Sequence, residues 1–374
     1  MSLTGTPVDL RIFAEAVRNR NERLSQCAQK QKILGWFCTY TPIELIHAAG
    51  FLPVRIYGGA IQITQAGALI PNFVCPYMRA SLERALRGEY RYLSGIVQGY
   101  TCDVPCGVMS IWEENAGPGL FHTIPLPYNN NEHARAFYRQ TVAELVDKLA
   151  GIGGRMDSIS LRKSLDLYAA IRSNQLRLHE ARTRNRLPIT AGEFYTVMEA
   201  GFSLPPEDYL GHIADLVESV ADNVEWKAGA IPVLVSGSIV EQMWIFDLLE
   251  NAGGRVIADD LCSGYRSCEP ADGNGIEPME RLIDRYMRHS PCPARSSVGE
   301  RITVIRKMVG ESGARGVIFL LQKFCTPHLA DYPAIARELK DDGIPVLLVE
   351  MDESGNIEGQ LKTRFQAFFE MIGG

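Results

Sequence analysis

The stretch G-I-V-Q-G-Y-T-C-D-V-P-C, from Gly95 to Cys106, combines the features that decide the fold and the candidate site of this chain. Its first half is a short apolar run of the kind that forms a buried strand. Cys102 follows directly where that strand should end, and Cys106 comes shortly after it. Ligands of open parallel sheets bind beyond the carboxyl ends of the strands, so this stretch indicates a candidate ligand position.

Strand-like and helical segments alternate on both sides of this stretch. Strand patterns before and after it are 33–37, F-L-P-V-R-I-Y, F-H-T-I-P-L-P, I-P-V-L-V-S-G-S, R-V-I-A-D-D, G-V-I-F-L-L-Q and I-P-V-L-L-V-E. The prolines of F-H-T-I-P-L-P are typical of an edge strand. Strands separated by helices predict an α/β fold with parallel sheets and right-handed crossovers.

The middle of the chain lacks a convincing strand pattern, and its leucines recur at helical spacing. We therefore predict an N-terminal α/β domain with a leading helix over 1–130. A connector of about four helices is expected over 131–225, and a second α/β domain over 226–374.

Three short segments recur in the same order in the two halves. C-P-Y-M-R-A-S-L-E-R from Cys75 can be laid on C-P-A-R-S-S-V-G-E-R from Cys292. The strand and thiol at 95–102 likewise match G-V-I-F-L-L-Q-K-F-C at 316–325, and H-A-A-G-F-L-P-V-R matches E-N-A-G-G-R-V. The order of these matches predicts that the two α/β domains arose by duplication.

The composition excludes several classes of protein. The chain has 374 residues, a net charge of −6 and 46% hydrophobic residues, which argues against a protein built mainly to bind nucleic acid. It has no run of 18 apolar residues, so we expect no membrane span. The first residues lack the apolar core of a signal peptide, and we expect a cytoplasmic protein whose nine cysteines do not form a disulfide scaffold.

Several of these cysteines occupy positions that suit ligands. Cys38, Cys102 and Cys325 each follow a predicted strand, whereas Cys75 and Cys292 stand at predicted helix N-termini, where the helix dipole favours thiolate. Thiolates without matching histidines favour zinc or an iron–sulfur cluster, and their dispersal fits a cluster held between two domains. Plain burial of the thiols is the alternative. Cys262 and Cys268 lie in a turn-rich loop, where they would either be ligands or belong to a loop that lines the pocket.

Three separated segments resemble signatures of the 2-hydroxyacyl-CoA dehydratase D-component family, which includes the cluster-bearing subunits of ATP-dependent benzoyl-CoA reductase. The first is G-W-F-C-T-Y-T-P-I-E-L-I-H-A-A-G-F-L-P-V-R, and the second runs from C-P-Y-M-R-A-S-L-E-R to G-I-V-Q-G-Y-T-C-D. The third begins at K-F-C-T-P-H-L-A-D-Y-P and continues through I-P-V-L-L-V-E-M-D. The resemblance spans about 33 to 371.

The resemblance implies two flavodoxin-like domains joined by helices, with an iron–sulfur cluster between them. The family's three ligands carry over onto Cys75, Cys102 and Cys325. Family members receive one electron from a separate ATP-hydrolysing iron–sulfur activator, pass it to an acyl-CoA and usually pair with a related second subunit. This chain carries no P-loop pattern, so we do not expect it to hydrolyse ATP itself.

The chain also departs from the usual family pattern. Dehydratase subunits commonly follow T-C-D with glycine and lysines, whereas here V-P-C supplies Cys106. Together with Cys292, this thiol would support a larger cluster in one chain. A branch of the family carries a double-cubane cluster, usually as a homodimer. A small-molecule reductase of that kind, an electron-relay partner of a catalytic paralogue and a structural zinc protein are therefore alternatives.

Four further residues are candidates for chemistry at the substrate. Thr39, Glu44 and His47 follow Cys38, and Glu44 and His47 share one helix face, from which they would shuttle protons. The alternative places Glu44 in the first helical turn for the dipole and packs His47 beneath the sheet. Arg79 would bind the phosphates of coenzyme A, although such arginines often form a solvated helix face.

Overall fold

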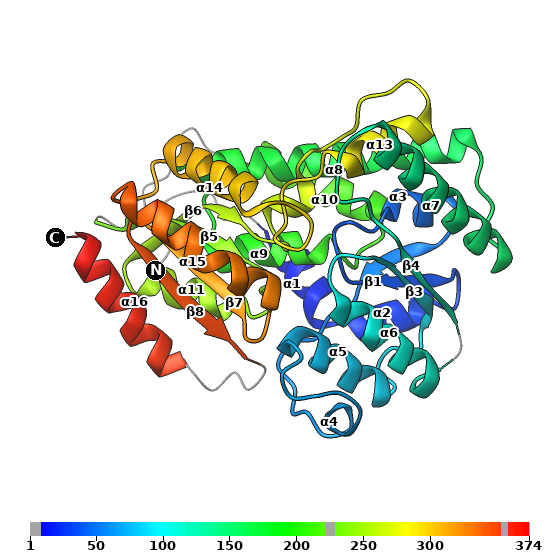
Figure 1. The fold of residues 1–374 in the computed structure, drawn as a ribbon, viewed down its shortest axis with the longest axis horizontal. Coiled ribbons are helices and arrows are strands. Elements are labelled where there is room, and N and C mark those ends of the chain that lie inside the picture. The colour runs from blue at the N-terminus through cyan, green and yellow to red at the C-terminus, as the bar shows by residue number, and fades with distance from the viewer. Residues whose placement is uncertain (1–8, 118, 221–228, 353–357, 374) are drawn as a thin grey trace.

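The computed structural model describes residues 9–117, 119–220, 229–352 and 358–373 (Figure 1). Two four-stranded sheets form its framework, with strand orders β2-β1-β3-β4 and β6-β5-β7-β8. Neighbouring strands run parallel in every pair. The strands are β1 (Ile33–Trp36), β2 (Leu52–Arg55), β3 (Leu93–Gly99), β4 (Leu120–Ile124), β5 (Ile231–Gly237), β6 (Gly254–Asp260), β7 (Val317–Gln322) and β8 (Val346–Met351).

The predicted α/β class is confirmed, and the two units are Rossmann-like. They share one topology, since β6-β5-β7-β8 repeats the order of β2-β1-β3-β4 with each strand replaced by its counterpart. Strand β4 lies at a sheet edge, as predicted, although the prolines at 125 and 127 follow the strand and do not lie within it.

Helices connect the strands and fill the region between the two sheets. They are α1 (Arg11–Arg18), α2 (Arg20–Cys27), α3 (Ile43–Ala48), α4 (Ala66–Leu69), α5 (Pro76–Leu86), α6 (Asp103–Asn115), α7 (Glu132–Gly151), α8 (Ser158–Thr183), α9 (Ala191–Ala200), α10 (Pro206–Glu218), α11 (Trp244–Asn251), α12 (Tyr265–Cys268), α13 (Pro278–Met287), α14 (Val298–Ser312), α15 (Thr326–Asp341) and α16 (Glu358–Gly373). In the described part of the chain, α7 to α10 stand between β4 and β5. Every described helix falls short of the length or the apolar character that crossing a bilayer requires.

The apolar runs of the second sheet are explained by burial of both its faces. On β7, Ile318 and Leu320 join one core cluster, whereas Val317, Phe319 and Leu321 join another. Helices α11 and α16 contribute to the first cluster, and α14 and α15 to the second. Because consecutive strand residues point to opposite faces, a strand covered on both sides has no polar alternation.

The leading segment forms two helices where the sequence predicted one, with a break at Asn19. Phe13 of α1 belongs to the large core cluster shared by α9, α10 and the second sheet. Leu24 of α2 instead packs on β1 and β2. The leading helices therefore tie the first sheet to the rest of the molecule.

Each sheet has a topological switch point, where the chain leaves one central strand toward one edge and returns on its other side. The pairs at these points are β1 with β3 and β5 with β7. Glycines allow close approach there: a Cβ on Gly237 would lie 2.0 Å from the carbonyl oxygen of Leu320, and one on Gly99 would lie 2.9 Å from that of Tyr40. Ligands of such sheets bind at the carboxyl ends beside the switch point.

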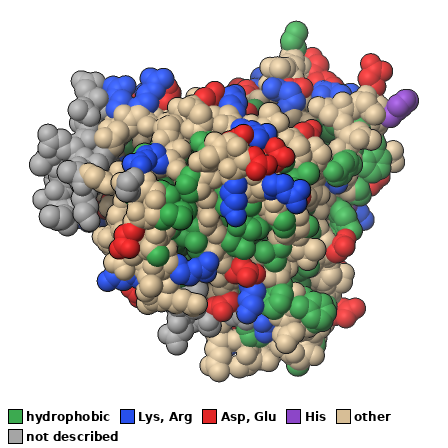
Figure 2. Space-filling model, turned by 60° about the vertical axis from the view of Figure 1, so that its left-hand side comes forward, with side chains coloured by type: hydrophobic (Ala, Val, Ile, Leu, Met, Phe, Trp, Pro, Cys, Tyr) green, Lys and Arg blue, Asp and Glu red, His purple; other side chains and the backbone are tan. Residues whose placement is uncertain are grey.

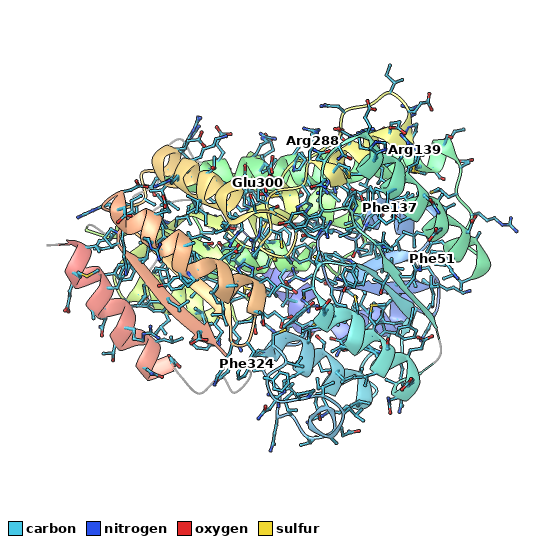
Figure 3. All side chains as sticks on the ribbon, in the orientation of Figure 1. Phe51, Phe137, Arg139, Arg288, Glu300 and Phe324 are labelled. Carbon is cyan, nitrogen blue, oxygen red and sulfur yellow. The ribbon has the colours of Figure 1, made fainter. Side chains whose placement is uncertain are left out.

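The molecular surface carries charged side chains of both signs. On the face shown in Figure 2, Lys and Arg side chains are interspersed with Asp and Glu. Large exposed apolar side chains include Phe137 on α7 and Phe324 before α15, both marked in Figure 3.

Candidate functional site

Six cysteine side chains line one cavity of about 110 Å³ at the carboxyl ends of both sheets, which we call the thiol cavity. The six are Cys38, Cys75, Cys102, Cys262, Cys292 and Cys325. All six are reduced cysteines. Its other walls include Phe37, Met78, Ile239 and Pro327, so most of the remaining surface is apolar.

The fold brings these thiols together because of where each strand ends. Cys38 and Cys102 follow β1 and β3, the switch-point pair of the first sheet. Cys262 and Cys325 follow β6 and β7 of the second sheet. The carboxyl ends of both sheets therefore contribute to one space, although the thiols are far apart in the sequence.

Three of the thiols occupy the N-cap positions of helices. Cys75 precedes α5, Cys102 precedes α6 and Cys325 precedes α15. The free N–H groups of a helix N-terminus and its dipole stabilise a thiolate there. Cys292, also predicted at a helix N-terminus, instead lies in a turn. Its carbonyl accepts hydrogen bonds from the N–H groups of Arg295 and Ser296, both at 2.8 Å. The prediction for Cys292 was wrong because α14 begins only after its N-cap Ser297.

Glutamine side chains of β3 and β7 hold two of the loops that line the thiol cavity. The Gln98 Oε1 atom accepts hydrogen bonds from the backbone N–H groups of Phe37 (3.1 Å) and Cys38 (3.0 Å). In the second unit, Gln322 donates from Nε2 to the Ile239 carbonyl at 3.0 Å. These contacts replace ladder hydrogen bonds where the central strands separate and fix the direction of the loops that follow.

The strongest electrostatic effects between thiols fall within two groups of three, and weaker effects cross between the groups. In group A (Cys75, Cys102 and Cys325), burial and then the neighbouring Cys325 raise the pKa of Cys102 to about 12. Burial and then the neighbouring Cys75 raise the pKa of Cys325 to about 12.

Group B comprises Cys38, Cys262 and Cys292. Burial raises the pKa of Cys38 to about 11, with Cys262 as the next cause. Burial also raises the pKa of Cys292 to about 12, against the lowering effect of Arg266 and with Cys262 and Cys38 adding to it. Each group draws thiols from both units, so the cavity exists only when the two sheets face each other.

Two buried guanidinium groups accompany the thiols. Arg55 lines the thiol cavity and is 3% exposed, and its Nη2 atom pairs with Glu199 at 2.5 Å. Within the described residues, no acceptor is bonded to its Nε and Nη1 atoms. Arg266 donates from Nη2 to the Cys262 sulfur at 3.3 Å. Because an unpaired buried donor is costly, these arginines fit a cavity that takes an anionic group.

The thiols surround the cavity without converging on one point. Among the residues described, no three Cys, His, Asp or Glu side chains lie close enough together to hold a single metal ion. The donor set is six sulfurs, the ligand type that iron–sulfur clusters and soft metals use.

The predicted thiol ligands are placed as follows. Cys38, Cys75, Cys102, Cys292 and Cys325 line the thiol cavity, whereas Cys106 is not among its lining residues. The Cys106 sulfur instead lies 4.0 Å from the Thr123 hydroxyl, beside β4. Cys262, which the sequence left undecided, provides the sixth thiol of the cavity.

A second cavity, of about 340 Å³, borders the thiol cavity along two segments of the chain. Tyr40 lines it one residue beyond Thr39, and Pro291 and Arg295 flank the Cys292 segment. The Tyr40 ring stacks on His289 with 4.2 Å between the ring centres. Burial raises the pKa of Tyr40 well above its usual value, so its hydroxyl keeps its proton.

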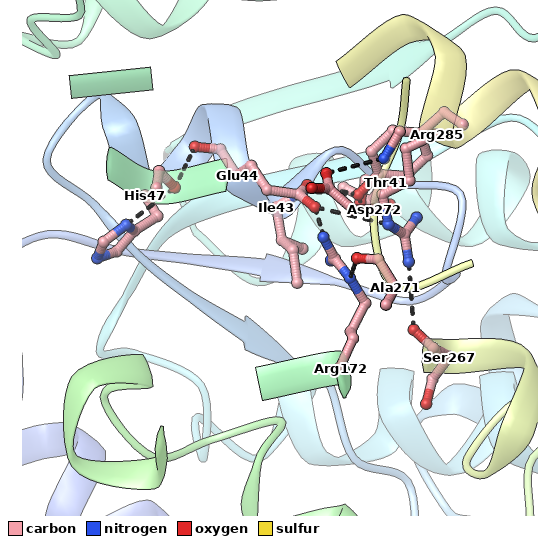
Figure 4. A network of polar contacts seen from close by, with 12 residues as sticks. Thr41, Ile43, Glu44, His47, Arg172, Ser267, Ala271, Asp272 and Arg285 are labelled. Atoms are coloured by element: carbon pink, nitrogen blue, oxygen red, sulfur yellow. Dashed lines mark hydrogen bonds and ion pairs between the residues drawn. The ribbon is translucent and has the colours of Figure 1, made fainter. Parts of the chain in front are cut away.

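Glu44 lies in a buried polar network apart from the thiol cavity (Figure 4). Its carboxylate is 2.6 Å from Arg172 Nη1 and 3.8 Å from Arg285 Nε, and it accepts a hydrogen bond from the Tyr286 hydroxyl at 2.7 Å. Burial raises the pKa of Glu44, but Arg172 and then Arg285 outweigh it and hold the pKa below its usual value. This network joins α3, α8 and α13.

The other proton-shuttle candidates are separated from one another. Thr39 lines the thiol cavity. His47 shares the helix with Glu44 but contacts Ser164 Oγ at 3.0 Å and Glu207 Oε1 at 3.2 Å. Helix α3 therefore directs the two side chains to different partners.

Arg79 lies on α5, one turn after Cys75, and is half-buried. Its Nη1 atom donates to the Asn72 carbonyl at 3.4 Å. The side chain is therefore held beside the loop that leads into α5.

Comparisons with known proteins show a family and several relatives that are similar to this chain over most of its length. A family model described as 2-hydroxyglutaryl-CoA dehydratase, D-component, matches residues 38–372. The (R)-phenyllactyl-CoA dehydratase beta subunit of Clostridium sporogenes is 25% identical over 96% of this chain and 97% of its own length. The beta subunit of lactoyl-CoA dehydratase from Anaerotignum propionicum is also 25% identical, covering 89% and 90%. A benzoyl-CoA reductase subunit of Thauera aromatica is 22% identical, covering 91% of each.

Proposed function

Since this chain belongs to the 2-hydroxyglutaryl-CoA dehydratase D-component family, we propose that it is the iron–sulfur component of a low-potential electron-transfer enzyme. The observation that carries the proposal is the thiol cavity, with six cysteine sulfurs from one chain around a single space. An ATP-hydrolysing iron–sulfur activator would supply the electron. The names of the relatives favour an acyl-CoA thioester as the acceptor.

Groups A and B would each hold one [4Fe-4S] unit, so that the cavity takes a double-cubane cluster. Three thiolates per unit leave one iron of each without a protein ligand. A cluster separates its thiolate-bound irons, which suits sulfurs that surround a space without converging on one ion. When bound, such a cluster supplies single electrons at low potential and a Lewis-acidic iron.

The protein's own residues would prepare this site in three ways. The guanidinium groups of Arg55 and Arg266 offset the negative charge of the thiolates. Apolar walls such as Phe37 and Ile239 exclude water, which favours a low potential. Tyr40 holds a proton on its hydroxyl in the wall of the second cavity, one residue beyond Thr39 of the thiol cavity, where a substrate would accept it.

Metal analysis tests the proposal most directly. Anaerobically reconstituted protein should contain iron and acid-labile sulfide in the amounts of two [4Fe-4S] units per chain and give an EPR signal on reduction. Cys102→Ser and Cys292→Ser, one from each group, should each lose a large share of the iron. Cys27→Ser is the matched control, because Cys27 lies on α2 outside the cavity. A reconstituted protein without iron would end the proposal, and stoichiometric zinc would replace it with a structural zinc site.

A second candidate, a homodimeric double-cubane reductase of small molecules, is favoured by the number of thiols. The three ligands that the family resemblance implies are group A alone, and group B is in excess of them. Turnover by the lone chain with activator and ATP separates the two. Reduction of small molecules by a dimer of this chain would favour the second candidate, whereas a requirement for a related subunit and an acyl-CoA would favour the first.

A further inference from the structure

Arg266 is a fully buried cation in direct contact with one of the six thiols. It belongs to the short helix α12 and is 1% exposed. Its Nη2 atom donates to the Cys262 sulfur at 3.3 Å and also to the carbonyl of Gly237, at the end of β5. The β5 terminus therefore holds the guanidinium in place, facing group B.

The counter-charge of Arg266 is shared with a second arginine. Arg266 Nη1 lies 3.5 Å from Asp260 Oδ1, and the other oxygen of Asp260 lies 3.0 Å from Arg301 Nη2. Asp260 also accepts from the Ser236 hydroxyl at 2.9 Å. Arg301 has a further partner, Asp331, at 3.3 Å. Because Arg301 shares the Asp260 carboxylate, that carboxylate neutralises only part of the charge of Arg266. The rest of the charge acts on the Cys262 sulfur.

Arg266 brings a full positive charge into contact with a thiol of group B, through its hydrogen bond to the Cys262 sulfur. The thiols of group A are instead placed at helix N-caps, where partial charges of backbone N–H groups act on them. A full charge that donates to sulfur stabilises a reduced, more negative cluster more strongly than such partial charges do.

We propose that Arg266 is the residue that sets the redox poise of group B, raising the reduction potential of the iron held by Cys38, Cys262 and Cys292 above that of the iron held by group A. The inference rests on the proposed iron–sulfur function and adds which of the two groups has the higher reduction potential. The more oxidising half is the one that borders the second cavity, since Cys292 lies within the Pro291–Arg295 segment that lines both. Arg266 acts through sulfur and is a positioning residue, not a catalytic one.

The test is an anaerobic potentiometric titration of the reconstituted protein, with titanium(III) citrate as reductant and EPR as the readout. Arg266→Met removes the charge and the donors at similar length, and Arg266→Lys keeps the charge without the planar fork. Arg255→Met is the matched control, because it removes a buried arginine of the same unit whose carboxylate partner is Glu250, at 2.7 Å, and not Asp260. Iron content and circular dichroism are measured for each variant.

Arg266→Met should shift the midpoint potential of the first electron to lower values, with Arg266→Lys between it and the wild type and Arg255→Met close to the wild type. Equal shifts in Arg266→Met and Arg255→Met, or none in Arg266→Met, would overturn the inference. If Arg266→Met fails to fold, an Arg266→Lys potential equal to that of the wild type overturns it as well. A wild-type protein that takes up no iron refutes the proposed function instead, so the two failures are distinguishable.

Discussion

Replacing Glu44 with glutamine tests whether this carboxylate holds the molecule together or handles protons. The Glu44 side chain has no exposed surface, and its ion pairs reach Arg172 at 2.6 Å and Arg285 at 3.8 Å (Figure 4). Both arginines are themselves nearly fully buried. Glutamine keeps the shape but removes the charge of the carboxylate that pairs with both guanidinium groups. Breaking a buried pair in this way costs about 3–5 kcal/mol, so we expect a loss of that order in the free energy of unfolding.

The contribution of Glu44 to the free energy of unfolding depends on pH with a definite sign. The pKa of Glu44 is held below its usual 4.5 in the folded chain. A lowered carboxyl pKa contributes stability that is present above the unfolded value and is lost as the pH falls through the folded one. The wild type should therefore lose this contribution below about pH 4.5, whereas Glu44→Gln should lack it at every pH.

Urea unfolding of the metal-free protein, followed by circular dichroism, gives the measurement. Glu207→Gln is the matched control, because Glu207 also contacts an α3 side chain, His47 at 3.2 Å, but is 62% exposed. An exposed pair of this kind is worth about 0–1 kcal/mol. The reasoning is refuted if Glu44→Gln unfolds at the wild-type urea concentration. Wild-type stability combined with lost turnover would assign Glu44 to proton transfer instead.

Two further predictions concern the thiols and the contact between the units. Cys262→Ser should lose iron on reconstitution whereas Cys106→Ser should retain it, because only Cys262 lines the thiol cavity; equal iron contents in the two variants would contradict the assignment. Glu241 accepts from the backbone N–H groups of Gly58 (2.9 Å) and Gly59 (2.7 Å) across the two units, and burial raises its pKa to about 7. A raised carboxyl pKa means that stability is lost as the pH rises from about 4.5 to 7, by at most about 3 kcal/mol. Unfolding midpoints at pH 5 and pH 8 should therefore differ in the wild type and converge in Glu241→Gln, and a wild type with equal midpoints would refute this.

The sequence was sufficient to predict the fold, because a strand buried on both faces of its sheet is a short continuous run of apolar residues. Apolar runs such as Val317–Gln322 have the length of strands, and helical patterns separate them, so a parallel α/β architecture follows without knowledge of any contact. The same rule placed Cys38, Cys102 and Cys325 at strand ends, and all three line the thiol cavity.

Local reasoning was less informative for the neighbours of these thiols. Cys106 follows Cys102 by four residues, a spacing that aligns side chains within a helix. However, Cys102 is the N-cap of α6 and has an extended backbone, with φ −134° and ψ 165°. Its side chain therefore does not lie on the same helix face as that of Cys106. Cys106 is directed toward Thr123 instead.

The sequence by itself therefore determined the strands, the helices and which loops carry thiols. The spacing of apolar residues and the ends of the strands are local properties of the sequence. Only the tertiary structure decided which thiols share one cavity and what surrounds them. Cys262 lines the cavity from the turn after β6, and Arg266 reaches its sulfur from the next helix. Glu44 finds Tyr286, 242 residues further along the chain, inside the contact between units. Such partners are set by the packing of the two sheets, which no short segment of sequence encodes.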